Sequence, residues 1–384
     1  MSQAVPAPER YFDYNGSTPL GESVQRVFVE TLAHYGNAAA PHPMGRAAAA
    51  LIDGARARIA RALGVLDEEI VFTSGGTESN NQALAGSAAL CPRGHLVVGA
   101  SEHKSVLAAA HALERGGHEL TLVAPRECGA IASEDIEAAL REDTCLVSVM
   151  WANNETGICQ PVGELAALCR RRKIRFHCDG VAAFGKLPID LSRVACDLFS
   201  LSGHKFHGPK GTGVLFVRSG TAIEPLLRGC GHQKGLRSST ENTAAIVALA
   251  EAAELAAEAA RTPGDSPAAL TQDLFESLRG ALPNIERNGK GACLPNTLNV
   301  HFPGAPAHRL QALLAEGGFS VAAGASAASG SASHVLLSMG HSAERASQSL
   351  RFSLGSANTA ESVAGLVQAL VHAVHSCRTA PSQP

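Results

Sequence analysis

The alternation of apolar runs with segments of helical periodicity between residues 71 and 217 limits most strongly what this chain can fold into. The runs have the length of single strands, and in the segments between them, such as residues 162–172, apolar positions recur every three to four residues. A strand that returns parallel to its neighbour needs a crossover of about a dozen residues, which a helix supplies. The pattern therefore predicts an α/β fold with a mostly parallel central sheet flanked by helices. The predicted strands are residues 95–100, 119–124, 145–151, 175–179, 197–201 and 213–217.

A break in this pattern predicts a second, smaller domain. An alanine-rich helix is predicted to end near residue 261, where Pro and Gly in residues 262–267 interrupt its periodicity. A chain of 384 residues is also too long for one small core. We predict a large domain over residues 15–260 and a smaller C-terminal α+β domain over residues 261–384, which residues 1–14 join.

Charge and cysteine usage indicate what kind of partner to expect. The net charge of −3 provides no basic surface for a nucleic acid or an anionic membrane, and no apolar stretch is long enough to span a bilayer. The N-terminus has no secretion leader, and the 10 cysteines form no Cys-x-x-Cys pair, so neither a disulfide framework nor a metal site is predicted. We expect a cytoplasmic protein that acts on a small molecule.

Polar residues follow several of the predicted strands, at the edge where parallel strands bind ligands. Residues 75–77, Gly-Gly-Thr, precede a predicted helix, so their backbone amides face an anion at its positive end. His103 and Asn154 follow two other strands, Asp179 is the last residue of a third, and residues 202–205 follow a fourth. Any one of them would ordinarily be a helix cap or a solvated side chain. Their occurrence together predicts a single site.

This set supplies what pyridoxal 5'-phosphate (PLP) chemistry requires. The cofactor needs a lysine for its Schiff base, a carboxylate against its pyridine nitrogen, an anion cup for its phosphate and a base near the substrate α carbon. Lys205, Asp179 and residues 75–77 are the predicted lysine, carboxylate and cup, and the base is His103 or Lys205 itself. A protonated ring nitrogen makes the cofactor a better electron sink. Asp179 is therefore predicted to set its reactivity.

Short motifs in a fixed order identify a family. They are FDYNGSTP at 12–19, TSGGTESN at 73–80, EHKSV at 102–106, NNETG at 153–157, SGHK at 202–205, GPKG at 208–211, GLRSSTEN at 235–242, LPNTLN at 294–299 and RFSLG at 351–355. Over nearly the whole chain, these motifs resemble those of the cysteine desulfurase and selenocysteine lyase family, fold-type I PLP enzymes of the class V aminotransferase superfamily. The resemblance implies L-cysteine or L-selenocysteine as substrate, a homodimer with a shared active site, and a sulfur-acceptor protein.

The resemblance also implies a role for each matching residue. His103 would stack on the cofactor ring and assist proton transfer, Asn154 would lie beside the ring hydroxyl, and Arg351 would grip the substrate carboxylate as a bidentate fork. The implied cofactor-binding residues are Gly76, Thr77, His103, Asn154, Asp179, Ser202, His204, Lys205 and, from a neighbouring subunit, Thr240. The implied substrate-binding residues are Asn15, Asn154 and Arg351.

The sequence departs from the family at three positions. The family's persulfide-forming cysteine lies in a loop that matches residues 324–331, and its place is taken by Ala327, which has no nucleophile. Ala182 replaces a glutamine that donates to the ring hydroxyl, and Ser356 replaces a frequent arginine.

Several alternatives for Ala327 stay open. It marks an engineered exchange of the cysteine in an ordinary desulfurase, a natural lyase that works by β-elimination without a persulfide, or a relocation of the thiol to Cys230. An aminotransferase or epimerase on the same scaffold is a further alternative. The non-enzyme alternative is a scaffold partner for a sulfur-relay protein.

Overall fold

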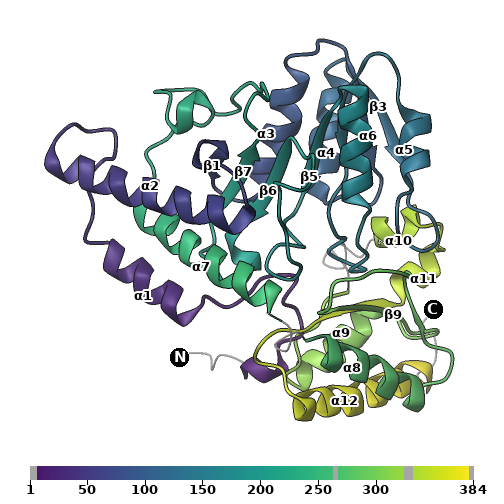
Figure 1. The fold of residues 1–384 in the computed structure, drawn as a ribbon. Coiled ribbons are helices and arrows are strands. Elements are labelled where there is room, and N and C mark those ends of the chain that lie inside the picture. Colours follow the sequence, from purple (N-terminus) through teal and green to yellow (C-terminus); the bar gives the residue numbers. More distant parts are fainter. Residues whose placement is uncertain (1–6, 263–266, 324–331, 380–384) are drawn as a thin grey trace.

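The central feature of the computed structural model, which describes residues 7–262, 267–323 and 332–379, is a seven-stranded sheet with the order β1-β7-β6-β5-β4-β2-β3 (Figure 1). Strand β7 runs antiparallel to both its neighbours, whereas β6, β5, β4, β2 and β3 pair in parallel. The predicted mostly parallel α/β sheet is therefore confirmed. The strands are β1 (Ile70–Thr73), β2 (His95–Gly99), β3 (Glu119–Val123), β4 (Thr144–Ser148), β5 (Arg175–Asp179), β6 (Leu198–Ser202) and β7 (Gly213–Val217).

Helices cover both faces of this sheet. One face buries Val97, Val147 and Phe176 in a core shared with α2, α6 and α7, and the other buries Leu96 and Val98 against α3 and α4. Burial on both faces explains why the strands read as continuous apolar runs. The helices of this part are α1 (Glu22–Thr31), α2 (Pro43–Leu63), α3 (Gly76–Ala88), α4 (Lys104–Arg115), α5 (Ser133–Ala139), α6 (Val162–Arg172) and α7 (Thr243–Arg261).

The C-terminal part is an α+β unit around a three-stranded antiparallel sheet with the order β10-β9-β8. It has its own apolar core, to which Phe12 from the N-terminal segment contributes. The predicted division at residues 260 and 261 stays a prediction. The elements are α8 (Ala268–Ala281), β8 (Glu286–Arg287), β9 (Thr297–His301), α9 (Ala307–Glu316), α10 (His334–Ser338), α11 (Ala343–Ser347), β10 (Ser349–Ser353) and α12 (Ala360–Thr379). None of the helices in the described ranges combines the length and apolar character needed to cross a bilayer.

His177 ties three strands together inside the large sheet. Its Nδ1 shares a hydrogen bond of 2.8 Å with Ser148 Oγ on β4, and its Nε2 shares one of 3.0 Å with Ser200 Oγ on β6. The side chain is fully buried, and this burial lowers the pKa of His177 to about 3. The imidazole is therefore neutral in the folded protein at pH 5, where an unfolded chain would protonate it.

Acidification is expected to destabilise the protein through His177. Because the unfolded imidazole binds a proton near pH 6.5 and the folded one does not, stability falls as the pH drops from about 6.5 toward 3. Between pH 7 and 5 this linkage costs about 2 kcal/mol. Urea unfolding at both pH values should show this loss in the wild type and not in His177→Asn. The exposed His111→Asn is the control, and equal pH dependence in all three proteins would contradict the assignment.

Candidate active site

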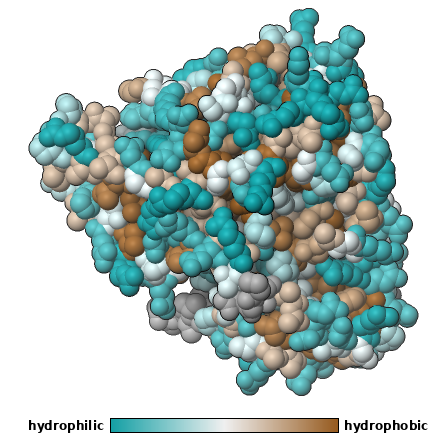
Figure 2. All heavy atoms as spheres, viewed as in Figure 1, coloured by the Kyte–Doolittle hydropathy of each residue, from teal (hydrophilic) through white to brown (hydrophobic). Residues whose placement is uncertain are grey.

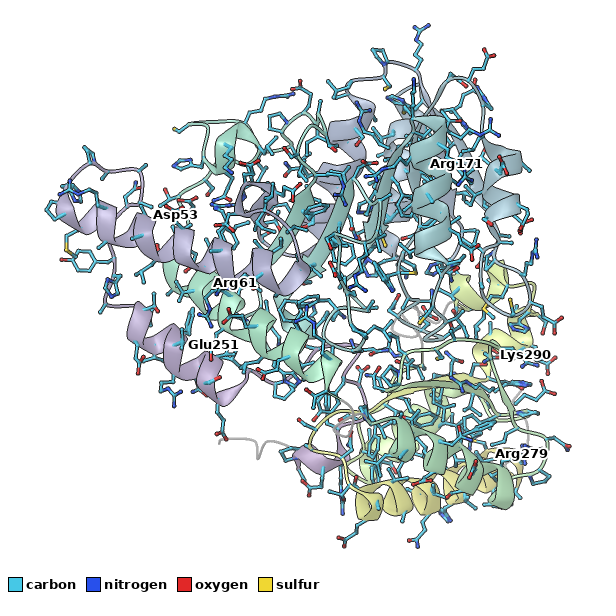
Figure 3. All side chains as sticks on the ribbon, viewed as in Figure 1. Asp53, Arg61, Arg171, Glu251, Arg279 and Lys290 are labelled. Carbon is cyan, nitrogen blue, oxygen red and sulfur yellow. The ribbon has the colours of Figure 1, made fainter. Side chains whose placement is uncertain are left out.

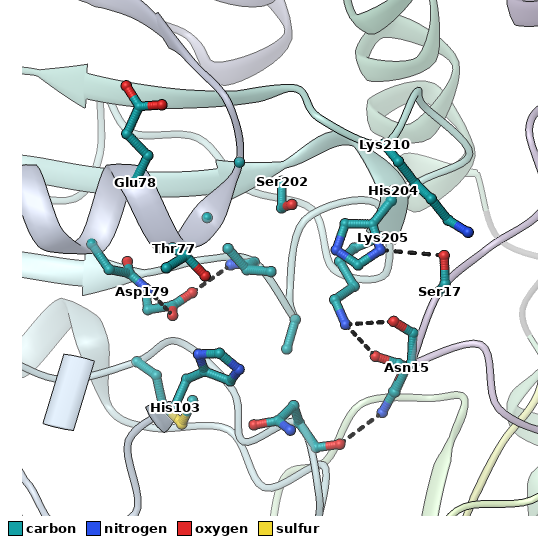
Figure 4. A pocket seen from close by; sticks show the side chains of 18 of the residues that line it. Asn15, Ser17, Thr77, Glu78, His103, Asp179, Ser202, His204, Lys205 and Lys210 are labelled. Atoms are coloured by element: carbon teal, nitrogen blue, oxygen red, sulfur yellow. Dashed lines mark hydrogen bonds between the residues drawn. The ribbon is translucent and has the colours of Figure 1, made fainter. Parts of the chain in front are cut away.

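A cavity of about 550 Å³ lies at the carboxyl edge of the parallel strands, beside the start of α3 (Figure 4). The sheet topology brings to it side chains from six separate stretches of the sequence. The predicted site residues that line it are Asn15, Gly76, Thr77, His103, Asn154, Asp179, Ser202, His204 and Lys205, and Ala182 lines it as well. The cavity thus gathers most of the residues singled out in the sequence.

Lys205 lies in a 3₁₀ turn (Gly203–Lys205) that directly follows β6. Its Nζ donates hydrogen bonds to the carbonyl oxygens of Asn15 at 2.5 Å and Gly16 at 2.9 Å, as the dashed lines in Figure 4 show. Burial, helped by the nearby charge of Arg351, lowers the pKa of Lys205 to about 8. A lysine with this pKa presents a neutral, nucleophilic amine far more readily than an exposed one.

Asp179 ends β5 and is held rigidly beside the cavity. Its Oδ2 accepts a hydrogen bond of 2.7 Å from Asn80 Nδ2, and its Oδ1 accepts one of 2.9 Å from the Val181 amide. Behind it lies Glu102, whose pKa is raised well above its ordinary value by burial and then by the charge of Asp179. Of these two buried acidic side chains, Asp179 is the one that lines the cavity.

His103 caps the N-terminus of α4 and turns its ring toward the cavity (Figure 4). Asn80 Nδ2 donates to Ser105 Oγ at 2.9 Å, so the Ser105 hydroxyl donates in turn to His103 Nδ1 at 2.8 Å. This bonding pattern assigns the ring proton to Nε2. Burial lowers the pKa of His103, against the opposing effect of Asp179, so the ring is a neutral imidazole with an N–H available to a ligand.

The N-terminus of α3 forms an anion cup. Gly75 precedes the helix with φ +151° and offers no side-chain cap, so the first-turn amides of this 13-residue helix remain available to a ligand. A Cβ on Gly76 would come within 2.7 Å of Val181 Cγ2, so glycine keeps the cup open. Ser202 and His204 complete it, and burial lowers the pKa of His204 to about 4, which leaves its ring neutral. Hydroxyls, helix amides and lysine ammonium groups are the donors that commonly bind a phosphate monoester.

These features fit PLP without rearrangement of the residues present. The cup provides donors for a dianionic phosphate, the rigid Asp179 provides an anion for a protonated pyridine nitrogen, and Lys205 provides the amine. Within the described ranges, no three His, Cys, Asp or Glu side chains gather as metal ligands would.

The lining residues that no prediction assigned to the site include Asn80, Lys186 and Lys210. Asn80 could have been found, because it lies one helical turn after Gly76 at the end of the same motif. Lys210 likewise lies in the Gly-Pro-Lys-Gly motif that follows Lys205. Lys186 has no comparable signal, since only the path of the chain after β5 brings it to the cavity.

Arg351 lies beside the cavity, and its implied role in gripping the substrate carboxylate stays a prediction. It lies on β10, is 5% exposed and is not among the residues that line the cavity. Its Nη2 donates to Asp13 Oδ1 at 2.5 Å, and its Nη1 donates to the Asn154 carbonyl at 2.9 Å. The guanidinium is therefore committed to an ion pair, and a substrate carboxylate would have to compete with Asp13 for it.

Thr240 and Cys230 do not reach this cavity in the chain's own fold. Thr240 is exposed in the segment before α7, and Cys230 is exposed on the same segment. Neither lines the cavity. Ala327 lies outside the described residues.

Comparisons with known proteins all lead to one family. The sequence pattern of the family described as Aminotransferase class-V matches residues 10–366. The chain is similar to the "Putative cysteine desulfurase IscS 1" of Bacillus subtilis (strain 168), with 38% identity over 363 residues, 92% of this chain and 95% of that protein. The solved structure of a "NIFS-LIKE PROTEIN" matches with a TM-score of 0.89 at 34% identity, over 95% of this chain and 98% of that one. "SspA in complex with cysteine" matches with a TM-score of 0.81 at 34% identity, over 91% and 100%.

Proposed function

The chain belongs to the class-V aminotransferase family and, within it, to the PLP-dependent cysteine desulfurases, and from this premise we propose that it cleaves the carbon–sulfur bond of L-cysteine or the carbon–selenium bond of L-selenocysteine. The observation that carries the proposal is the convergence of Lys205, Asp179 and His103 on one cavity. Relatives named as cysteine desulfurases, and a similar structure described as a complex with cysteine, support the choice of substrate.

In this proposal each lining residue holds one part of the cofactor. Gly76, Thr77, Ser202 and His204 would hold the phosphate, Asp179 would pair with the pyridine nitrogen, and Asn154 and His103 would hold the ring. When bound, PLP supplies the electron sink that makes the α proton of an amino acid acidic and the bond at its β carbon labile.

Protons are moved by two groups of known geometry. Lys205 Nζ, with its lowered pKa, accepts the α proton of the substrate close to neutral pH. His103 carries its proton on Nε2 and donates it to the leaving sulfur, while Nδ1 stays fixed by Ser105. Asn15 and Asn154 line the cavity opposite the anion cup, where they bind the substrate, with Arg351 behind Asn154.

The fate of the sulfur depends on whether a thiol attacks it. Ala327 offers none, and none of the described cysteines lines the cavity. Without a thiol, L-cysteine and water give pyruvate, ammonia and sulfide by β-elimination. With a cysteine at position 327, the sulfur is retained as a persulfide and the product is alanine, which then requires an acceptor protein. The surrounding loop sequence, Gly-Ala-Ser-Ala-Ala-Ser-Gly-Ser, resembles the cysteine-bearing loop of the family and supports this second candidate if Ala327 is an engineered exchange.

Product analysis tests the proposal. The present chain, its Ala327→Cys variant and the Cys230→Ser variant would each be incubated with L-cysteine and L-selenocysteine, and alanine, pyruvate and sulfide or selenide quantified. We expect pyruvate and sulfide in equal amounts from the present chain and from Cys230→Ser, and alanine from Ala327→Cys. Alanine from the present chain that disappears in Cys230→Ser would instead establish the relocated thiol. Failure of every version to consume either substrate would overturn the proposed function.

A homodimer is part of the same proposal. The arm formed by α1, α2 and their connection exposes Val29, Leu32, Tyr35 and Met44, by 59%, 56%, 84% and 42%, and Figure 2 shows apolar surface along it. A second copy that covered this arm would bury these side chains. We propose that Thr240 of each subunit then reaches the other subunit's anion cup.

Sedimentation of the wild type should show a dimer, and Leu32→Glu should weaken this dimer. A wild type and a variant that both sediment as monomers would contradict the proposed homodimer.

A further inference from the structure

An ion pair adjoins the anion cup. Its acidic member is Glu78, which lies in the first turn of α3 and lines the cavity together with residues 75–77. Glu78 Oε2 accepts a hydrogen bond of 2.8 Å from the amide of Ser74, the residue directly before the cup. The carboxylate is therefore fixed next to the backbone that would hold the cofactor phosphate, at the start of α3 (Figure 4).

A carboxylate in this place opposes the binding of a phosphate. The positive end of a helix attracts any anion, so an ionised Glu78 already compensates part of the charge that the cup offers. It would also repel a dianionic phosphate bound to the neighbouring amides. Burial raises the pKa of Glu78, but hydrogen bonds from Arg237 and Ser74 outweigh burial and leave this pKa below its ordinary value. Glu78 is thus negative at neutral pH.

Arg237 supplies the compensating cation through a two-point contact. Its Nε donates to Glu78 Oε1 at 2.9 Å, and its Nη2 donates to Glu78 Oε2 at 3.3 Å. The side chains of Arg237 and Glu78 are only 16% and 10% exposed, so water and salt screen this pair less than an ion pair at the surface. Such a fork holds the positive charge at a fixed distance from the carboxylate.

The segment on both sides of Arg237 is held by backbone contacts. The Leu236 carbonyl accepts a hydrogen bond of 2.6 Å from Gln82 Nε2 on α3, and the Leu236 side chain packs against the apolar core beside that helix. The Ser238 amide donates to the Leu227 carbonyl at 3.1 Å. These contacts involve one subunit alone, so the fold itself presents the guanidinium to Glu78.

We propose that Arg237 is a positioning residue that neutralises the Glu78 carboxylate, so that the anion cup accepts a dianionic phosphate. Arg237 does not line the cavity, so it acts on the phosphate through Glu78 and not by contact. The inference deepens the proposed function, because it rests on the proposed cofactor site, but it does not depend on the substrate. The alternative role is that of a tether, in which the pair merely fastens the segment to α3.

PLP and pyridoxal, which lacks the phosphate, separate these two roles. Dissociation constants for both compounds would be measured by absorbance at neutral pH for the wild type, Arg237→Met, Glu78→Gln and the double variant Glu78→Gln/Arg237→Met. Glutamine keeps an acceptor for the Ser74 amide. Arg171→Met is the matched control, since Arg171 is exposed on α6 and does not line the cavity (Figure 3).

The charge role gives a distinctive expected pattern. Arg237→Met should weaken PLP binding about tenfold or more, because it leaves an unpaired carboxylate at the cup, whereas pyridoxal binding should change less than about threefold. The double variant should recover PLP binding to within about threefold of the wild type, because neither charge remains. Glu78→Gln should bind PLP as tightly as the wild type or more tightly, and Arg171→Met should equal the wild type.

Several outcomes would overturn the proposal. They are unchanged PLP binding in Arg237→Met, equal losses of PLP and pyridoxal binding in that variant, and a double variant that binds PLP as poorly as Arg237→Met. Weakened PLP binding in Glu78→Gln would also overturn it, and this comparison holds even if Arg237→Met does not fold. No amino acid is present, so a protein that shows the expected pattern but leaves cysteine intact contradicts the proposed substrate and supports the role of Arg237.

Discussion

Lys205→Ala is expected to bind PLP only reversibly and to cleave L-cysteine more than about 10⁴-fold more slowly than the wild type, the upper end of what a positioned proton acceptor contributes. The substitution removes both the covalent anchor and the group that accepts the α proton. Two observations set this expectation: Lys205 Nζ is fixed on the carbonyls of Asn15 and Gly16, and its pKa is about 8. Among the described lysines, Lys205 is the one whose Nζ donates to these two carbonyls.

Absorbance and product assays check the expectation. The visible band of the cofactor-bound protein should be lost on dialysis of Lys205→Ala and retained in the exposed Lys290→Ala. A dialysed Lys205→Ala protein that keeps its band would mean that another lysine anchors the cofactor, and Lys186 would be the first to examine, since it lines the same cavity.

Asp179→Asn is expected to retain PLP and to lower the rate of cysteine cleavage by about 10²- to 10³-fold, the usual cost of removing one preorganised charge from an active site. Asparagine has the same shape and keeps a hydrogen-bond acceptor for the Val181 amide, but it carries no negative charge to hold a proton on the pyridine nitrogen. Glu102 cannot substitute, because it does not line the cavity and its Oε1 accepts from the Met150 amide behind Asp179.

The rate of α-proton exchange into solvent deuterium, measured with L-alanine, isolates this effect from sulfur chemistry. It should fall in parallel with cleavage. Asp190→Asn is the control, since Asp190 lies on the same connection after β5 but does not line the cavity and pairs with Ser192 and Arg193. An Asp179→Asn enzyme that exchanges the α proton at the wild-type rate would remove Asp179 from its assigned role.

Arg351 illustrates where a family resemblance and a structure give different information. The motif at 351–355 implies an arginine directed at the substrate carboxylate, whereas the structure has its guanidinium on Asp13 and the Asn154 carbonyl. The sequence specifies the residue type, but the partner comes from a segment more than 300 residues away, so no local pattern could reveal the ion pair.

The sequence by itself determined the element types and the principal site residues. Continuous apolar runs with helical segments between them are a local signature of strands buried on both faces, and the predicted strand at 213–217 coincides with β7. Since parallel strands end at one edge, His103, Asp179 and Lys205 could be assigned to one site before any contact was known.

Only the tertiary structure decided the direction of β7, the partners of Arg351 and the place of Lys186. An apolar run indicates that a strand is buried, and burial is the same for either strand direction. The sequence pattern therefore could not predict that β7 pairs antiparallel to its neighbours. Lys186 and Lys205 line the same cavity because of the path that the chain takes after β5 and the turn that follows β6. Such proximity between distant residues is fixed by packing of the whole domain, because local periodicity carries no information about which turns come to lie together.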